Sequence, residues 1–199
     1  MGLAKQAKIL TNKQVEAVYQ YLGTMRNGLR NQVIFLLSVK AGLRAKEIAA
    51  LKWSMVTNAD GDIGVEIHLT DAASKGRGGR VIPLNRHLRE KLTELFEEEC
   101  DQNDFDISSS HVIRTERAQK TTSQAIVNMF VLWYADIGLT GCSSHSGRRT
   151  FITNAARKIS SVGGSLRDVQ ALAGHSSLAV TQRYIEGDGE ARVKVVELV

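Results

Sequence analysis

Two histidines, several arginines and a late tyrosine have the types and spacing suited to chemistry on a phosphate. His145 and Arg148 lie three residues apart in HSGR, and His175 follows a glycine in AGHSS. Tyr184 comes nine residues after His175, on a segment that we expect to be helical. Residues 143–184 carry six arginines and lysines but only one acid. This composition favours chemistry on a polyanion.

Cleaving a phosphodiester without a metal needs a nucleophile, cations around the phosphate and an acid for the leaving oxygen. A tyrosine can be the nucleophile and form a covalent intermediate. Arginine forks bind phosphate through paired hydrogen bonds and keep their charge. A lysine or histidine can protonate the leaving 5′ oxygen. The chain offers such groups at Arg44, Lys75, His145, Arg148, His175 and Tyr184.

Each of these residues also has a structural interpretation when it is taken alone. Either histidine could be a core or capping residue, and Tyr184 could be a buried aromatic side chain. Arg44 and Glu47 are three apart on a short predicted helix, where they can pair as a surface ion pair that contributes little. The position of Arg44, just after a buried helix and its cap, favours a functional role.

The segment ASKGRGGR is predicted to be a flexible hairpin loop between two strands. Lys75, Arg77 and Arg80 stand on it, and such a loop can reach a DNA groove or a phosphate. It can equally be a solvated turn. It is not a P-loop, because the GxxxxGK[ST] pattern is absent and no helix follows directly.

Hydrophobic periodicity predicts an α+β fold that is mostly helical, with a small three-stranded antiparallel sheet. Strands are expected at Trp53–Val56, Ile63–Leu69 and Arg80–Pro83. The helix from Asn27 to Ala41 is apolar nearly all round, so we expect it at the centre of the core. The other expected helices begin at Thr11, near Arg44, after Asn85, at Thr121, at Ser146, after Ser165 and after Ser176.

Length and composition bound the class of protein. The 199 residues fit one domain, and a net charge of +5 with a pI near 9.3 is compatible with nucleic-acid binding. We find no membrane-length apolar run and no signal-peptide core. The widely separated Cys100 and Cys142 favour a reducing cytoplasm. The acidic run from Glu97 to Asp106 lacks EF-hand spacing, so no metal site is expected.

Four segments together resemble the signature boxes of the tyrosine recombinases, the phage integrase family. They are GLRAKEI, HSGRRT, AGHSS and TQRY. One box alone is weak evidence, but four in order, with a lysine on a hairpin between the first two, are specific. The resemblance covers about Thr11 to Tyr184. It implies a catalytic domain over residues 11–186 that makes a 3′-phosphotyrosyl link, as a homotetramer on two double-stranded DNA sites, with no metal, ATP or other cofactor.

The resemblance also implies a role for each matching residue. These roles are phosphate binding by Arg44 and Arg148, support of Arg44 by Glu47, general acid catalysis by Lys75, proton transfer by His145, a phosphate hydrogen bond from His175 and nucleophilic attack by Tyr184. We expect further DNA contacts from Arg77, Arg80, Arg149 and Arg183.

The chain departs from the family pattern in three ways. Ala173 replaces the usual leucine before Gly-His, which we expect to change packing only. Gly147 replaces an apolar residue before the arginine, which we expect to loosen the start of that helix. Only residues 1–10, expected to be a mobile basic lead-in, precede the catalytic domain, where most members carry an N-terminal helical domain, so we expect either a naturally short member or a fragment. The tail 187–199 is expected to dock in cis or on a neighbouring subunit.

Two other functions are compatible with the same fold. One is a DNA-binding regulator that no longer cuts, which the complete set of boxes disfavours. The other is a type IB topoisomerase, which the small size disfavours. A serine hydrolase is poorly supported, because the chain has no G-x-S-x-G elbow.

Overall fold

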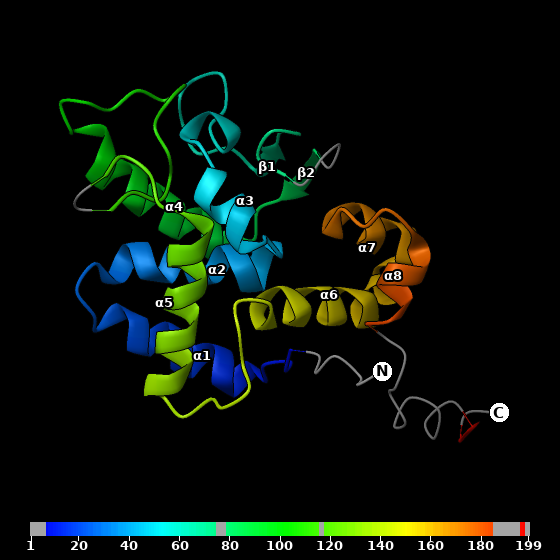
Figure 1. Ribbon diagram of the computed structural model, residues 1–199. Coiled ribbons are helices and arrows are strands. Elements are labelled where there is room, and N and C mark those ends of the chain that lie inside the picture. Colours follow the sequence, from blue (N-terminus) through cyan, green and yellow to red (C-terminus); the bar gives the residue numbers. More distant parts are fainter. Residues whose placement is uncertain (1–6, 75–78, 116–117, 185–195, 198–199) are drawn as a thin grey trace.

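The computed structural model describes residues 7–74, 79–115, 118–184 and 196–197. Its elements are α1 (Asn12–Gly23), α2 (Gly28–Ala41), α3 (Ala45–Ala50), the 3-10 helix η1 (Trp53–Met55), β1 (Glu66–Leu69), β2 (Arg80–Pro83), α4 (Arg86–Cys100), α5 (Ser123–Asp136), α6 (Ser146–Lys158), the 3-10 helix η2 (Ile159–Val162), α7 (Leu166–Ala173) and α8 (Leu178–Gln182). Helices α1–α5 lie on one side of the molecule and α6–α8 on the other (Figure 1). The predictions for Lys75 and Arg77, and most of those for the lead-in and the tail, fall outside the described residues.

Helix α2 is the central element, as its all-round apolar sequence predicts. Nine of its fourteen residues are buried, and it contacts α1, α4 and α6. Asn27 caps its start in the left-handed conformation, and Gly42 ends it at φ 66°. A glycine suits this end, because side chains rarely adopt a positive φ. The end of α2 therefore leads directly into Arg44.

The hydrophobic core has two parts that meet at α6. The larger cluster is built from α1–α5, the strands and their connections. The smaller one consists of Ile152, Ala156, Val169 and Ala173, with Tyr184 partly buried against it. One part therefore carries Arg44 and the other carries the tyrosine, so the two must be held in register for both residues to serve one site.

The sheet has two strands, and the strand predicted at Trp53–Val56 is wrong. β1 and β2 pair antiparallel with Leu69 opposite Arg80. The segment from Trp53 instead forms η1, with Trp53 buried edge-on against Phe96. Beyond it, only an isolated bridge joins Thr57 to Ile63. Buried tryptophan packing thus outweighs strand propensity, and β1 starts later than the predicted Ile63.

The predicted helix starts are mostly confirmed. Thr11 and Gln14 form the expected capping box, and the Asn85 side chain accepts from the N–H of His87. Ser165 caps α7. The cap of α8 is Ser177, one residue after the predicted Ser176.

The last residue of the predicted lead-in packs against the core. Leu10 is 3% exposed and belongs to the main core. Its backbone N–H donates to Thr150 Oγ1 at 2.8 Å. The end of the lead-in is therefore fixed against α6. Among the described residues, none of the helices is long and apolar enough to cross a membrane.

Gly147 brings α6 and α2 into close contact, and the expectation that it loosens the start of α6 is wrong. A Cβ at this position would lie 2.3 Å from Ser38 Oγ and 3.0 Å from Val39 Cγ1. Gly147 and Ser38 are both fully or nearly fully buried. The glycine therefore allows α6, which carries Arg148, to lie directly on the central helix.

We predict that Gly147→Ala destabilises the protein by about 1–3 kcal/mol through overpacking against Ser38. The gain in helix propensity is small, because the residue lies in the first turn of α6. Urea unfolding measures the change. Gly64→Ala is the control, since a Cβ there would make only ordinary contacts of 3.5 Å or more. Equal stability of the two variants would contradict the close approach.

Candidate active site

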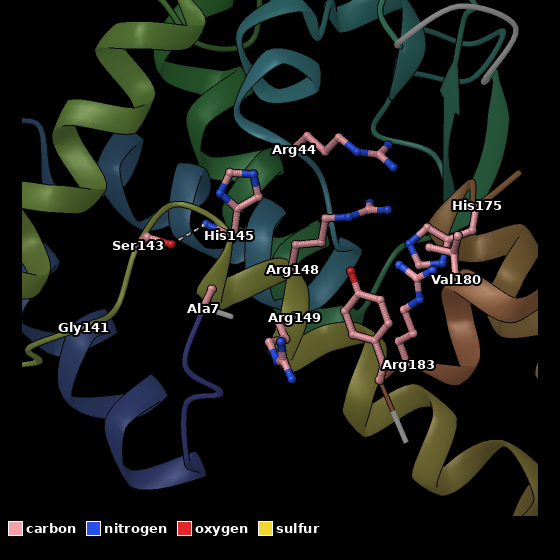
Figure 2. A pocket seen from close by; sticks show the side chains of 11 residues that line it. Ala7, Arg44, Gly141, Ser143, His145, Arg148, Arg149, His175, Val180 and Arg183 are labelled. Atoms are coloured by element: carbon pink, nitrogen blue, oxygen red, sulfur yellow. Dashed lines mark hydrogen bonds between the residues drawn. The ribbon is translucent and has the colours of Figure 1, made fainter. Parts of the chain in front are cut away.

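The chemistry-bearing residues from both halves of the chain line one pocket of about 600 Å³. Figure 2 shows it from close by. The predicted residues among its lining are Arg44, His145, Arg148, Arg149, His175, Arg183 and Tyr184. Arg80 lies behind this surface, and Lys75 and Arg77 are outside the described residues. The fold therefore brings together five of the six residues assigned to catalysis.

Arg44 enters the pocket from the start of α3. It is the N-cap residue of that helix, and its backbone N–H donates to Glu47 Oε2 at 2.8 Å. Its guanidinium forms an ion pair with Glu47 Oε1 at 2.7 Å, as the three-residue spacing predicts. Glu47 is 1% exposed. A fixed, buried carboxylate thus orients Arg44, whose own side chain remains 35% exposed toward the pocket.

Glu47 is also held by a second arginine, from β2. Arg80 Nη1 donates to Glu47 Oε1 at 2.9 Å and Arg80 Nη2 to Oε2 at 3.1 Å. Burial alone raises the pKa of Glu47, but the hydrogen bonds and charge of Arg80, together with those of Arg44, lower this pKa to about 2. Glu47 is therefore ionised throughout the physiological range.

The location of Arg80 argues against the predicted DNA contact. Its side chain is only 7% exposed, and its Nε donates to the carbonyl of Leu172 at 2.9 Å. The strand alternation contains a signal for this orientation. Arg80 is two residues from the buried Ile82 and pairs with the buried Leu69, so it lies on the inner face of the sheet.

Arg148 is buried at the floor of the pocket, with 5% of its surface exposed. Its Nη1 donates to the carbonyl of Gly42 and its Nη2 to the carbonyl of Ala173. Burial first, and then the charge of Arg44, lower the pKa of Arg148 to about 10. Arg148 remains cationic at neutral pH, and Figure 2 shows its guanidinium beside that of Arg44.

His175 faces the two arginines from the far side of the pocket (Figure 2). Its Nδ1 lies 3.0 Å from Thr181 Oγ1, an interaction that fixes the ring and that sequence reasoning missed. Burial, followed by the charges of Arg148, Arg44 and Arg80, lowers the pKa of His175 to about 4. The imidazole is therefore neutral at pH 7.

Tyr184 is placed by ring contacts on two sides. It lies in a turn just after α8, where its N–H donates to the carbonyl of Thr181. Its ring stacks on His175 with centroids 5.4 Å apart. The Arg149 guanidinium carbon is 5.8 Å from the ring centroid, within the range of a cation–π contact. The helix predicted for this position ends at Gln182 instead.

His145 occupies the N-cap position of α6 and is exposed. Its backbone N–H donates to Ser143 Oγ at 3.3 Å. Figure 2 places its ring on the opposite side of Arg148 from His175. Together these groups form a concave, cationic surface that can bind a phosphate oxygen and present an aromatic hydroxyl. Within the described ranges, no cluster of side chains could hold a metal ion.

Comparison with known proteins gives a consistent result. A family model described as the phage integrase family matches residues 8–190. The chain is 30% identical over 176 residues to tyrosine recombinase XerC of Pediococcus pentosaceus, covering 87% of this chain and 54% of that protein. It is 27% identical to XerA of Thermococcus kodakarensis, covering 89% and 57%. The chain thus spans little more than half the length of these relatives.

Solved structures show the same fold. A crystal structure of XerA recombinase matches with a TM-score of 0.73 at 19% identity, covering 96% of this chain and 64% of that one. XerH recombinase bound to a palindromic difH substrate matches with a TM-score of 0.76 at 20% identity, covering 98% and 53%. The fold is therefore that of a tyrosine recombinase catalytic domain, as the resemblance implied.

We predict that His175 makes the stability of the protein depend on pH. Its pKa is about 4 when folded and about 6.5 when unfolded. Between these values the unfolded chain binds more protons, so stability is full above about pH 6.5 and falls as the pH drops toward 4. Urea unfolding should show a larger loss from pH 7 to pH 5 in the wild type than in His175→Gln. Parallel losses would contradict a neutral, half-buried imidazole.

Proposed function

Because the chain belongs to the phage integrase family, we propose that it is a site-specific DNA recombinase. It cleaves and rejoins DNA strands through a 3′-phosphotyrosyl intermediate. The observation that carries this proposal is the meeting of Arg44, Arg148, His175 and Tyr184 around one pocket. Two fixed cations and a tyrosine supply the phosphate-binding charge and the nucleophile that metal-free phosphodiester cleavage requires, and Lys75 is the proposed acid for the leaving oxygen.

The proposed cleavage step exchanges one oxygen on phosphorus for another. The hydroxyl oxygen of Tyr184 passes its proton toward His145 and bonds to the scissile phosphorus, while the bond from phosphorus to the 5′ oxygen breaks. Lys75, the proposed general acid, gives the leaving oxygen its proton. His145 assists proton transfer. Reversal of the step by the 5′ hydroxyl of another strand rejoins the DNA, so the phosphodiester bond energy is conserved and no ATP is needed.

The arginines stabilise the charge that develops on the phosphate. Arg44 and Arg148 point fixed N–H donors at the pocket, where their orientation costs no reorganisation during the reaction. His175 is neutral, so it can donate a hydrogen bond to a non-bridging oxygen without exchanging a proton. Its contact with Thr181 keeps the ring in place. In this proposal the permanent cations bind the phosphate, and the histidine orients it through a hydrogen bond.

We propose double-stranded DNA as the partner, with the active form a homotetramer on two sites. Arg149 and Arg183 line the pocket and are the proposed source of further phosphate contacts, with Arg77 as a third candidate. The basic balance of the chain supports such a partner. Recombination of this kind acts on DNA in the cytoplasm, which is the location we propose.

We predict that Tyr184→Phe abolishes covalent adduct formation. The assay uses a nicked suicide substrate that carries the cognate recombination site, followed by a denaturing gel. Wild-type protein should give a protein–DNA adduct, whereas the phenylalanine variant lacks the attacking oxygen. Tyr21→Phe is the matched control, because it also removes one hydroxyl, which donates to Asp136 away from the pocket.

Three outcomes would contradict this assignment. An adduct that persists in Tyr184→Phe would place the nucleophile elsewhere. Specific DNA binding by the wild type without any adduct on the cognate site would instead favour a regulator that no longer cuts. Relaxation of supercoiled DNA that lacks the site would favour a topoisomerase.

We also predict that DNA affinity falls steeply with salt, because bound cations release counterions from the duplex. Replacing one phosphate-contacting arginine should reduce the slope of log K against log salt by about 1. Fluorescence anisotropy at several salt concentrations should show this reduction for Arg183→Gln. Arg86→Gln is the control, because Arg86 lies on α4 with its side chain 92% exposed and does not line the pocket. Equal slopes for the two variants would remove Arg183 from the DNA contacts.

A further inference from the structure

Arg80 connects three segments that are distant in the sequence. From β2 it donates two hydrogen bonds to the Glu47 carboxylate on α3. From its Nε it donates a third to the Leu172 carbonyl, in the last turn of α7. The helix end leads through Gly174 into His175. One guanidinium therefore joins the half of the site that carries Arg44 to the half that carries the histidine.

We propose that Arg80 is a positioning residue: it holds Glu47, and through Glu47 the phosphate-binding Arg44, against the C-terminal end of α7. The inference rests on the proposed recombinase function. It assigns no contact with DNA to Arg80 itself. It differs from a general stabilising role, because the consequence of losing Arg80 falls on the geometry of the pocket.

The hydrogen-bond geometry supports this role. Arginine has five N–H donors, and three of those of Arg80 are directed at protein acceptors. Arg80 and Glu47 meet through two parallel bonds, which fix the orientation as well as the distance. With 7% and 1% of their side chains exposed, neither group can exchange its partner for water.

The end of α7 is shaped around Arg80, which is an independent observation. Gly174 ends the helix at φ +59°, and a Cβ there would lie 3.0 Å from both Cδ and Nη1 of Arg80. The absence of a side chain at Gly174 thus gives the guanidinium room beside the helix end. The last carbonyls of a helix also carry partial negative charge, which a cation stabilises.

The negative charge of the buried Glu47 depends on both Arg80 and Arg44 for its compensation. Glu47 accepts hydrogen bonds from both Arg80 and Arg44. Without Arg80, the buried carboxylate would keep only Arg44 as a cationic partner, and Arg44 would be drawn toward it and away from the phosphate. An uncompensated buried charge also favours protonation, which would release Arg44 altogether. Both consequences reduce the rate of cleavage even when the protein is saturated with DNA.

The test compares Arg80→Gln and Arg80→Lys with the wild type in single-turnover cleavage of the suicide substrate at saturating DNA. We expect Arg80→Gln to cleave about 100-fold more slowly at saturating DNA, as for a misplacement of about 1 Å, with a salt slope that falls by no more than the single phosphate contact of Arg44. Arg80→Lys should recover part of the rate, because it restores the charge but not the three-way hydrogen bonding. If Arg80→Gln does not fold, Arg80→Lys still tests the proposal, because it keeps the positive charge.

Arg89→Gln is the matched control. Arg89 donates from Nε and Nη2 to the Ile63 carbonyl, so its removal deletes one positive charge and comparable backbone bonds without touching Glu47. It should cleave like the wild type. Slower cleavage by the control to the same extent as Arg80→Gln would show a general structural effect and overturn the proposal.

Other outcomes separate the competing roles. Normal cleavage at saturating DNA with weaker binding and a smaller salt slope would make Arg80 a DNA contact. If wild-type protein forms no adduct at all, the proposed function fails, and the positioning role is then decided in the free protein. There, NMR titration of the Glu47 carboxyl should give a higher pKa in Arg80→Gln than in the wild type. An unchanged Glu47 pKa would overturn the proposal independently of activity.

Discussion

The candidate active site depends on buried arginines whose N–H groups donate to carbonyl and carboxylate oxygens of the protein. Its two halves rest on separate hydrophobic clusters, and across the site the bonds between them are polar. Arg80 reaches the Leu172 carbonyl, and Arg148 reaches the carbonyls of Gly42 and Ala173. Burying a guanidinium is costly unless its donors are paired. These contacts therefore contribute less to net stability than to holding one relative position of the two clusters.

Such fixed positions matter because phosphate chemistry relies on electrostatic stabilisation. Donors that are already oriented stabilise a developing charge without reorganising as it forms. Burial, and then the nearby cations, keep His175 neutral, while the hydrogen bonds and charges of Arg80 and Arg44 keep Glu47 ionised against the effect of its burial. Both groups are therefore deprotonated: the imidazole can donate a hydrogen bond without releasing a proton, and the carboxylate orients Arg44. The close packing of α6 on α2 at Gly147 belongs to the same arrangement, since α6 carries Arg148.

Much of this arrangement could be predicted from the sequence, where local rules determine it. The central helix, the caps at Thr11 and Asn85 and the pairing of Arg44 with Glu47 follow from periodicity and spacing. The strand predicted at Trp53–Val56 is wrong because Trp53 is buried among aromatic side chains. This is a long-range effect that strand propensity does not contain. Gly147 was misjudged for the same reason: its partner, Ser38, is more than a hundred residues away. The inward direction of Arg80 was available from the alternation of β2, but the basic loop beside it favoured a DNA contact.

Under the proposed function, Arg148 is both part of the framework and a ligand for phosphate. Two of its five N–H donors are directed at the carbonyls of Gly42 and Ala173. The remaining donors are available to the pocket that it lines. A phosphate that uses these donors does not compete with the backbone carbonyls. In the proposed reaction, binding therefore leaves the bonds between the two clusters in place, and the framework that orients the cations persists.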